Sequence, residues 1–106
     1  MIKLYLNEIG YFYNGVSQKI GTLPKLSPKD RIWTILGAAL VELVENKHKD
    51  VTICTDQEYI KDEWGKPSNK VCILVQKYVK SNNIRVILEI IPSNVLSNNI
   101  STCSPK

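Results

Sequence analysis

Two short runs rich in β-branched residues constrain the fold of this chain more than any other feature. Val51–Thr55 lies between polar segments, and Ile84–Ile91 is the most strand-like stretch of the sequence. The composition and length of both runs are typical of buried strands. The residues between them show helical spacing, and two strands joined through helices pair in parallel by a right-handed crossover. The chain is therefore predicted to be an α/β protein.

A capped amphipathic helix precedes the first of these runs. Ser27-Pro28-Lys29-Asp30 combines an N-cap serine, a proline at the first helical position and an acid three residues after the cap. From Ile32 to Val44, apolar residues recur at intervals of three and four, and the polar residues 46–50 end the pattern. This segment is predicted to be a long helix with one buried face.

Two shorter helices are expected between the two strand runs. Gln57–Trp64 has a helical composition, and Gly65-Lys66-Pro67 interrupts it. Ser68 is predicted to cap the second helix. The inner face of that helix is apolar and consists of Val71, Leu74, Val75 and Tyr78.

The N-terminal residues predict antiparallel strands. Apolar residues alternate with polar ones from Ile2 to Leu6, and the aromatic run Tyr11–Tyr13 leads into Asn14-Gly15, a pair typical of tight hairpin turns. Val16–Thr22 is then expected to return as a partner strand. The complete prediction is a mixed five-stranded sheet, three antiparallel strands followed by parallel strands, with helices packed on its faces.

Length and composition predict one small domain with a modest core. The chain has 106 residues, of which 43% are apolar. Residues 1–92 are expected to form this domain. Residues 93–106 are rich in Ser, Thr and Asn, so we expect them to form a flexible tail.

Charge and cysteine usage narrow the class of protein. A net charge of +4 slightly favours a polyanionic partner. Three irregularly spaced cysteines argue against a disulfide framework and against a closed zinc site, which fits a reducing, intracellular compartment, cytoplasmic or nuclear. No apolar run approaches 20 residues, so we expect no interaction with a membrane.

The element order and one motif resemble the ribonuclease H family. Val51–Ile60 is similar to the family's strand that ends in Thr-Asp-Ser-x-Tyr-Val, whose aspartate binds metal, and Asp56 occupies that position. Ile2–Gly10 resembles the first strand, where the family has an aspartate that bridges two metal ions and this chain has Asn7. The resemblance covers roughly residues 2–91 and implies the mixed sheet described above. It also implies cleavage of the RNA strand of an RNA/DNA hybrid with two divalent ions.

The departures from the family's pattern remove ligands that this chemistry needs. Two hard cations are held close together only by several carboxylates. Asn7 is neutral, Trp33 stands where the family has a helical glutamate, and the region aligned with the last acidic ligand, Ser93–Thr102, contains no Asp or Glu. Of four carboxylates only Asp56 remains. We therefore expect no bound metal and interpret Asp56 and Asn7 as vestigial site residues.

Other acids near these positions have structural interpretations as well. Asp30 lies one helical turn before Trp33, but it also completes a capping box with Ser27. Glu8 follows Asn7 and should point to the opposite face of its strand. Asp56 itself is interpreted either as a retained site residue or as a cap of the helix that follows. If a metal is held at all, the expected set is Asp56 with Asp30 or Glu8. Trp33 is expected to pack against the core.

Four lysines in the two later helical segments are candidates for contacts with a nucleic-acid backbone. They are Lys66, Lys70, Lys77 and Lys80, of which the last three share one helix face. The ribonuclease H family uses basic residues in this part of the fold to hold nucleic acid. The alternative is an ordinary solvated helix face that carries no function.

Three functions remain in competition. The first is a non-catalytic ribonuclease H-like domain that acts as a nucleic-acid-binding, architectural or interaction module, of the kind found in viral or retroelement polyproteins or in larger complexes. The second is a nuclease with a reduced or rearranged carboxylate site that uses Mg²⁺ or Mn²⁺. The third is a protein-interaction or oligomerisation module without a nucleic-acid role. The pattern of lost ligands favours the first, with RNA/DNA hybrid, other nucleic acid, a protein partner or a second copy as the partners to consider.

Overall fold

The computed structural model describes residues 2–7, 10–13, 16–19 and 25–103. They form a mixed five-stranded sheet with the strand order β3-β2-β1-β4-β5. The strands are β1 (Ile2–Leu6), β2 (Gly10–Tyr13), β3 (Val16–Lys19), β4 (Asp50–Thr55) and β5 (Arg85–Ile90). Four helices complete the fold: α1 (Pro28–Glu45), α2 (Tyr59–Gly65), α3 (Lys70–Ser81) and α4 (Ser93–Cys103). The predicted α/β class is confirmed.

Strand pairing follows the predicted pattern. β2 pairs antiparallel with β1 and with β3, whereas β4 lies parallel to both β1 and β5. In the parallel pairs Tyr5 is opposite Cys54 and Thr55 is opposite Ile90. The carboxyl ends of β1, β4 and β5 therefore lie at the same edge of the sheet, where a ligand site is usual in folds of this class.

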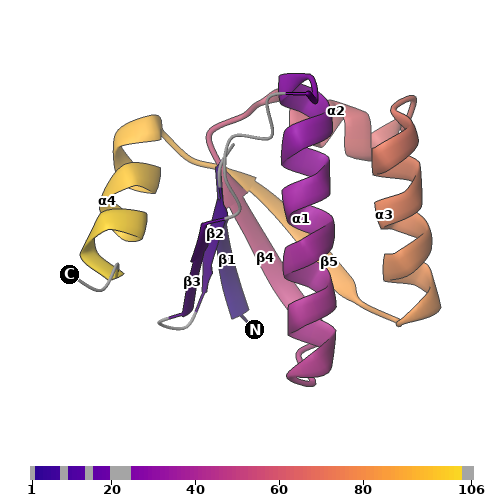
Figure 1. Ribbon diagram of the computed structural model, residues 1–106, viewed down its shortest axis with the longest axis horizontal. Helices are drawn as coiled ribbons and strands as arrows, with labels where there is room; N and C mark the ends of the chain where they lie inside the picture. Colours follow the sequence, from indigo (N-terminus) through magenta and orange to yellow (C-terminus); the bar gives the residue numbers. More distant parts are fainter. Residues whose placement is uncertain (1, 8–9, 14–15, 20–24, 104–106) are drawn as a thin grey trace.

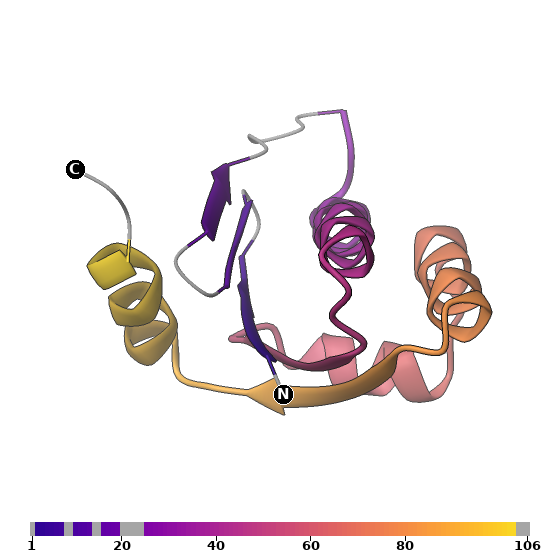
Figure 2. The ribbon, with the colours of Figure 1, turned by 90° about the horizontal axis from the view of Figure 1, so that it is seen from below.

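The helices lie on both faces of the sheet. Figures 1 and 2 show α1 and α3 side by side on one face and α4 on the other. α1 begins at Pro28 and is capped by Ser27, as predicted. The Ser27 hydroxyl accepts a hydrogen bond from the Asp30 backbone N–H at 3.3 Å. α3 is capped by Asn69 and not by Ser68: the Asn69 side-chain oxygen accepts from the N–H groups of Val71 and Cys72. The predicted cap was wrong by one residue.

The core lies between α1 and the sheet. Leu4, Leu6, Val51 and Ile53 project from β1 and β4 towards the apolar stripe of α1, and all four are at most 1% exposed. Cys54 and Cys72 are both buried. Burial raises the pKa of Cys72 to about 11 and also raises that of Cys54, so both thiols stay protonated at neutral pH.

The segment after Pro92 differs from the prediction. Residues 93–103, which we expected to belong to a flexible tail, form α4, and its Leu96 is only 3% exposed. The sequence shows few apolar residues here, but Leu96 is buried where α4 packs on the sheet. Residues 104–106, Glu8 and the predicted Asn14-Gly15 turn lie outside the described residues.

Within the part of the chain that the structure describes, no helix combines the length and the apolar character needed to cross a bilayer.

Candidate functional site

The candidate site lies where β1, β4 and β5 end. Asn7 follows β1 directly, Asp56 follows β4, and Ser93 begins α4 soon after β5. Continuing the register in which Tyr5 is opposite Cys54 brings Asn7 level with Asp56. Asn7 and Asp56 thus lie at the ends of neighbouring parallel strands.

Asp56 is held by hydrogen bonds from neutral groups. Its Oδ2 accepts from the Ser93 hydroxyl at 2.8 Å, and its Oδ1 accepts from the Gln57 side-chain amide at 3.0 Å. It does not act as the side-chain cap of α2, which has none. A pocket of about 370 Å³ lies beside it and is also lined by Glu58, Ile91 and Pro92. Asp56 is therefore a partly buried carboxylate on the wall of a small polar pocket.

Asn7 closes the connection between β1 and β2. Its side-chain oxygen accepts from the Gly10 backbone N–H at 2.9 Å, and its own N–H donates to the Gly10 carbonyl at 3.1 Å. Asparagine is well suited to this local bonding of side chain to backbone. Asn7 therefore has a structural role, because it links the end of β1 to the start of β2.

Trp33 packs as expected and leaves no room for a metal ligand. It is 0% exposed, its ring stacks on that of Trp64 with centroids 6.0 Å apart, and its Nε1–H donates to Glu63 at 3.3 Å. Lys29 lies 3.4 Å from the other oxygen of Glu63. The Trp33 side chain therefore packs α2 against α1.

Asp30 serves a different partner from the one expected. Its carboxylate accepts from the Asn69 side-chain amide at 2.6 Å, while the oxygen of the same amide caps α3. Asp30 thus links the N-termini of α1 and α3. The Asp30 backbone N–H donates to the Ser27 hydroxyl, which is one half of the predicted capping box, while the Asp30 carboxylate bonds Asn69. Glu8, the other acid considered for a rebuilt site, lies outside the described residues.

The donor set does not fit the two divalent ions that the family uses. Among the described residues, no three His, Cys, Asp or Glu side chains come together as a metal-binding group. Asn7 and Ser93 add neutral oxygens, which do not offset the repulsion between two cations. No catalytic step through a metal pair can be derived from this site.

Two residues of the site were not identified from the sequence. Ser93 was assigned to the tail, although its position just after the last strand would have placed it at the same sheet edge. Glu58 lies two residues after Asp56, and its contribution to the pocket depends on the sharp turn between β4 and α2. That turn carries no strong sequence signal.

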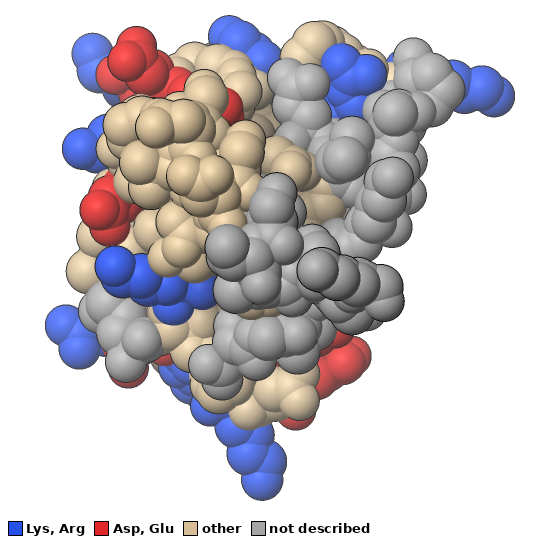
Figure 3. Space-filling view, turned by 90° about the vertical axis from the view of Figure 1, so that its left-hand side faces the viewer, with Lys and Arg blue, Asp and Glu red and all other residues tan. Residues whose placement is uncertain are grey.

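The four candidate lysines are all exposed. Lys66 follows α2, and Lys70, Lys77 and Lys80 lie on α3, which contains no acidic residue. None of the four forms an ion pair with another described residue. By contrast, α4 carries no charge of its own, and Figure 3 shows the Lys and Arg side chains scattered around the α4 side of the molecule. The α3 surface is accordingly the better candidate for a polyanion.

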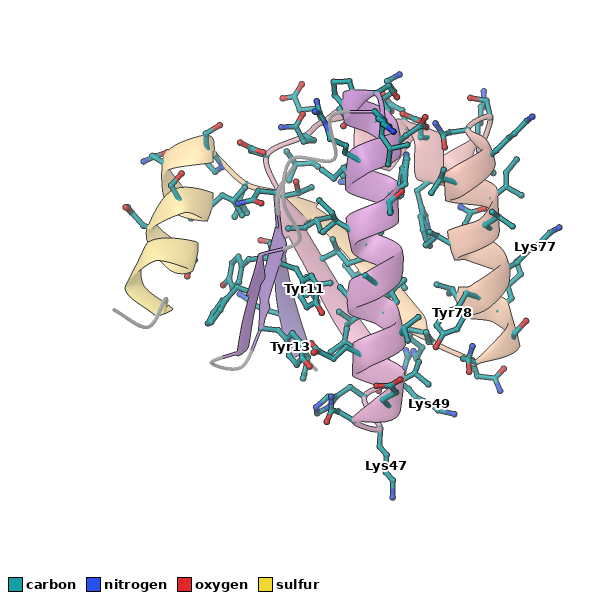
Figure 4. All side chains as sticks on the ribbon, viewed as in Figure 1. Tyr11, Tyr13, Lys47, Lys49, Lys77 and Tyr78 are labelled. Carbon is teal, nitrogen blue, oxygen red and sulfur yellow. The ribbon has the colours of Figure 1, made fainter. Side chains whose placement is uncertain are left out.

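A second polar cluster lies near the C-terminal end of α1. Tyr11 and Tyr13 point from β2 towards α1 (Figure 4), where the Glu42 carboxylate lies close enough to affect both hydroxyls. Asn46 lies 3.4 Å from the Tyr13 hydroxyl, and the His48 ring meets the Tyr13 ring edge-on at 6.4 Å. Burial, followed by the nearby Glu42, raises the pKa of both tyrosines, and that of Tyr13 reaches about 12. The cluster joins α1 to β2.

Comparison of the chain with known protein families, with curated proteins and with solved structures finds no match.

Proposed function

We propose that this chain is a ribonuclease H-like domain that has lost two-metal catalysis and acts by binding nucleic acid. The element order and the placement of Asn7 level with Asp56 support the likeness to the family. The observation that carries the loss of catalysis is the environment of Asp56: its carboxylate is held by Ser93 and Gln57, and no other carboxylate of the family's set is present.

The surface that supports binding is α3. Lys70, Lys77 and Lys80 give this helix three positive charges and no negative one. Lysines without a carboxylate partner are available to replace counterions along a phosphate backbone, which supplies most of the affinity in sequence-independent binding.

Metal-dependent cleavage remains the second candidate because Asp56 and Glu58 line the same pocket. Two carboxylates can hold a single Mn²⁺ weakly. Such a site would differ from the family's and would depend on Glu58, for which the resemblance gives no role.

The first experiment separates binding from cleavage. A labelled RNA/DNA hybrid is incubated with the protein in Mg²⁺, in Mn²⁺ and with a chelator, alongside Asp56→Asn and Glu58→Gln. We expect the original chain and both variants to bind the hybrid without cleaving it under all three conditions. Cleavage that requires metal and Asp56 would reject the non-catalytic proposal, and additional dependence on Glu58 would identify the second candidate.

The second experiment tests the α3 surface. Lys70→Glu/Lys77→Glu should weaken binding of the hybrid about tenfold and lower the slope of log affinity against log salt by about 2. The matched control is Lys3→Glu, an exposed lysine on β1 whose side chain faces away from α1. Equal binding by both variants would exclude α3 as the contact surface.

A further inference from the structure

An apolar groove runs between α1 and α3 on the side away from the sheet. Gly37, Ala38 and Val41 line it from α1, and Leu74, Val75 and Tyr78 line it from α3. We call it the α1–α3 groove; its volume is about 280 Å³. In Figure 4, Tyr78 extends from α3 towards α1 across this groove.

The exposure of its apolar residues needs an explanation beyond the fold. Leu74 is 63% exposed and Val41 is 41% exposed, the first of these being the most exposed large apolar side chain among the described residues. The two lie on opposite borders of one groove, so they form a continuous apolar surface. Such surfaces usually mark a site of interaction.

Gly37 also supports an interaction site at this groove. A glycine in the middle of a helix costs about 1 kcal/mol relative to alanine. A Cβ atom at position 37 would meet Val75 Cγ2 at 3.5 Å, an ordinary contact, so packing of α1 against α3 does not require glycine. What glycine does provide is depth on the floor of the groove.

Charge decides which occupant fits. Lys70 and Lys77 flank Leu74 on the outer side of α3, where Lys77 points into solvent (Figure 4). Lys47 and Lys49 follow the C-terminal end of α1, next to Glu45. A second copy of the chain would bring another net charge of +4 against this surface. An acidic partner is attracted to it instead.

The shape of the groove favours a helix. Side chains spaced three and four residues apart on one helix fit the depression between two neighbouring helices. α3 has 12 residues and is therefore about 18 Å long, which matches roughly three turns of a partner helix. We propose that the α1–α3 groove binds an acidic amphipathic helix of a partner protein, with its apolar face against Leu74 and Val41 and its carboxylates near Lys70 and Lys77.

The test uses a displayed library of amphipathic helical peptides with randomised polar positions, selected on the full chain. Binders are then sorted on Leu74→Asp, with Ile87→Asp as the control, because Ile87 is 50% exposed on β5, outside the groove. We expect a class of binders that lose about tenfold in affinity with Leu74→Asp and keep it with Ile87→Asp. Members of this class should carry net negative charge and weaken about fivefold with Lys70→Glu/Lys77→Glu.

Gly37→Leu provides a second variant that adds no charge. It fills the floor of the groove and should reduce binding of the same class, while thermal unfolding shows whether each variant is folded. The proposal is overturned if no binder depends on Leu74, or if the dependent binders are neutral or basic. It is also overturned if the chain itself forms dimers or binds anionic lipid vesicles in a manner that Leu74→Asp abolishes.

Discussion

Asn7 is the residue on which the proposed loss of two-metal catalysis depends most directly. Its side chain accepts the Gly10 N–H and so closes the turn after β1. An aspartate oxygen makes the same hydrogen bond, so the turn alone does not distinguish the two residues. The difference is that an aspartate at position 7 would place a second negative charge level with Asp56 at the end of the neighbouring parallel strand.

Asn7→Asp should therefore fold and acquire affinity for a divalent ion. We expect a free energy of unfolding within about 1 kcal/mol of the original chain without metal. Saturating Mn²⁺ should raise the melting temperature of Asn7→Asp by about 3 °C more than that of the original chain. Adding Asp56→Asn should remove this increment. A variant that gains nothing from Mn²⁺ would show that the two strand ends do not form a common site.

Tyr11 and Tyr13 connect single residues to the pH dependence of stability. Their pKa is raised in the folded protein, to about 12 for Tyr13, above the ordinary value of 10.0. Both hydroxyls are protonated in either state well below pH 10, so they give no pH dependence there. As the pH rises above 10, the unfolded chain loses these protons first, and the stability that they contribute is lost progressively up to about pH 12.

We expect the two tyrosines to leave the urea midpoint of unfolding unchanged between pH 8 and about 9.5. At higher pH the midpoint should fall. Above pH 10 the free energy of unfolding should fall with a slope that approaches about 1.4 kcal/mol per pH unit for each of the two tyrosines. Tyr13→Phe should make the fall above pH 10 shallower, because one of the two protons is removed. Tyrosinate absorbance on the folded protein provides an independent measure. A steep fall that is unchanged in Tyr13→Phe would assign the alkaline transition to other groups.

At the scale of elements, both long helices end in the same way. Lys47 and Asn83 follow the C-caps of α1 and α3 and have positive φ values of 64° and 54°. In α1 the His48 N–H donates to the Leu43 carbonyl at 2.8 Å, and the Lys47 N–H donates to the Val44 carbonyl at 3.0 Å. This is the Schellman arrangement, in which glycine is the preferred residue at the left-handed position. Asparagine tolerates that conformation better than lysine does.

Lys47→Gly should therefore stabilise the protein by about 0.5–1 kcal/mol, because it removes the strain of a side chain at positive φ. Lys49→Gly is the matched control: it removes the same charge at a position without positive φ and should destabilise by about 0.5 kcal/mol through backbone entropy. Chemical denaturation of the two variants gives the comparison. Equal effects of the two changes would mean that charge, and not backbone conformation, decides the outcome.

At the scale of the whole molecule, the sheet is covered on both faces only because α4 returns to it. α4 lies against the face opposite α1 (Figure 2), and Leu96 is its most deeply buried described residue. Ser93 at its first turn also holds Asp56. The same helix therefore covers one face of the sheet and positions the Asp56 side chain of the candidate site.

Leu96→Ala tests this docking directly. Loss of a buried leucine side chain should lower the free energy of unfolding by about 2–3 kcal/mol. Val95→Ala, at a neighbouring position that is 38% exposed, should change it by less than about 0.5 kcal/mol. Thermal and urea unfolding of both variants would decide the matter. Indifference to Leu96→Ala would indicate that residues 93–103 do not pack on the sheet in solution.

The order of elements follows from the sequence because its signals are local. Alternation from Ile2 to Leu6, the Ser27 cap and the apolar spacing from Ile32 to Val44 each depend on residues within one or two turns, and each element formed where it was predicted. The pairing of β4 with β5 also follows, since helices between two strands leave a parallel arrangement as the favoured solution. Asp56 was proposed as a site residue through the resemblance of Val51–Ile60 to a family motif, and that motif is also local.

Only the tertiary structure decided what the individual side chains do. The bond from Asp30 to Asn69 spans 39 residues, and that from Trp33 to Glu63 spans 30 residues. Contacts over such distances depend on how the helices pack, which no local pattern contains. The same holds for α4, which packs on the sheet through its buried Leu96, and for the α1–α3 groove, which exists only where two helices meet. Local periodicity therefore predicted the strands and the first three helices, whereas long-range packing determined α4, the candidate site and the α1–α3 groove.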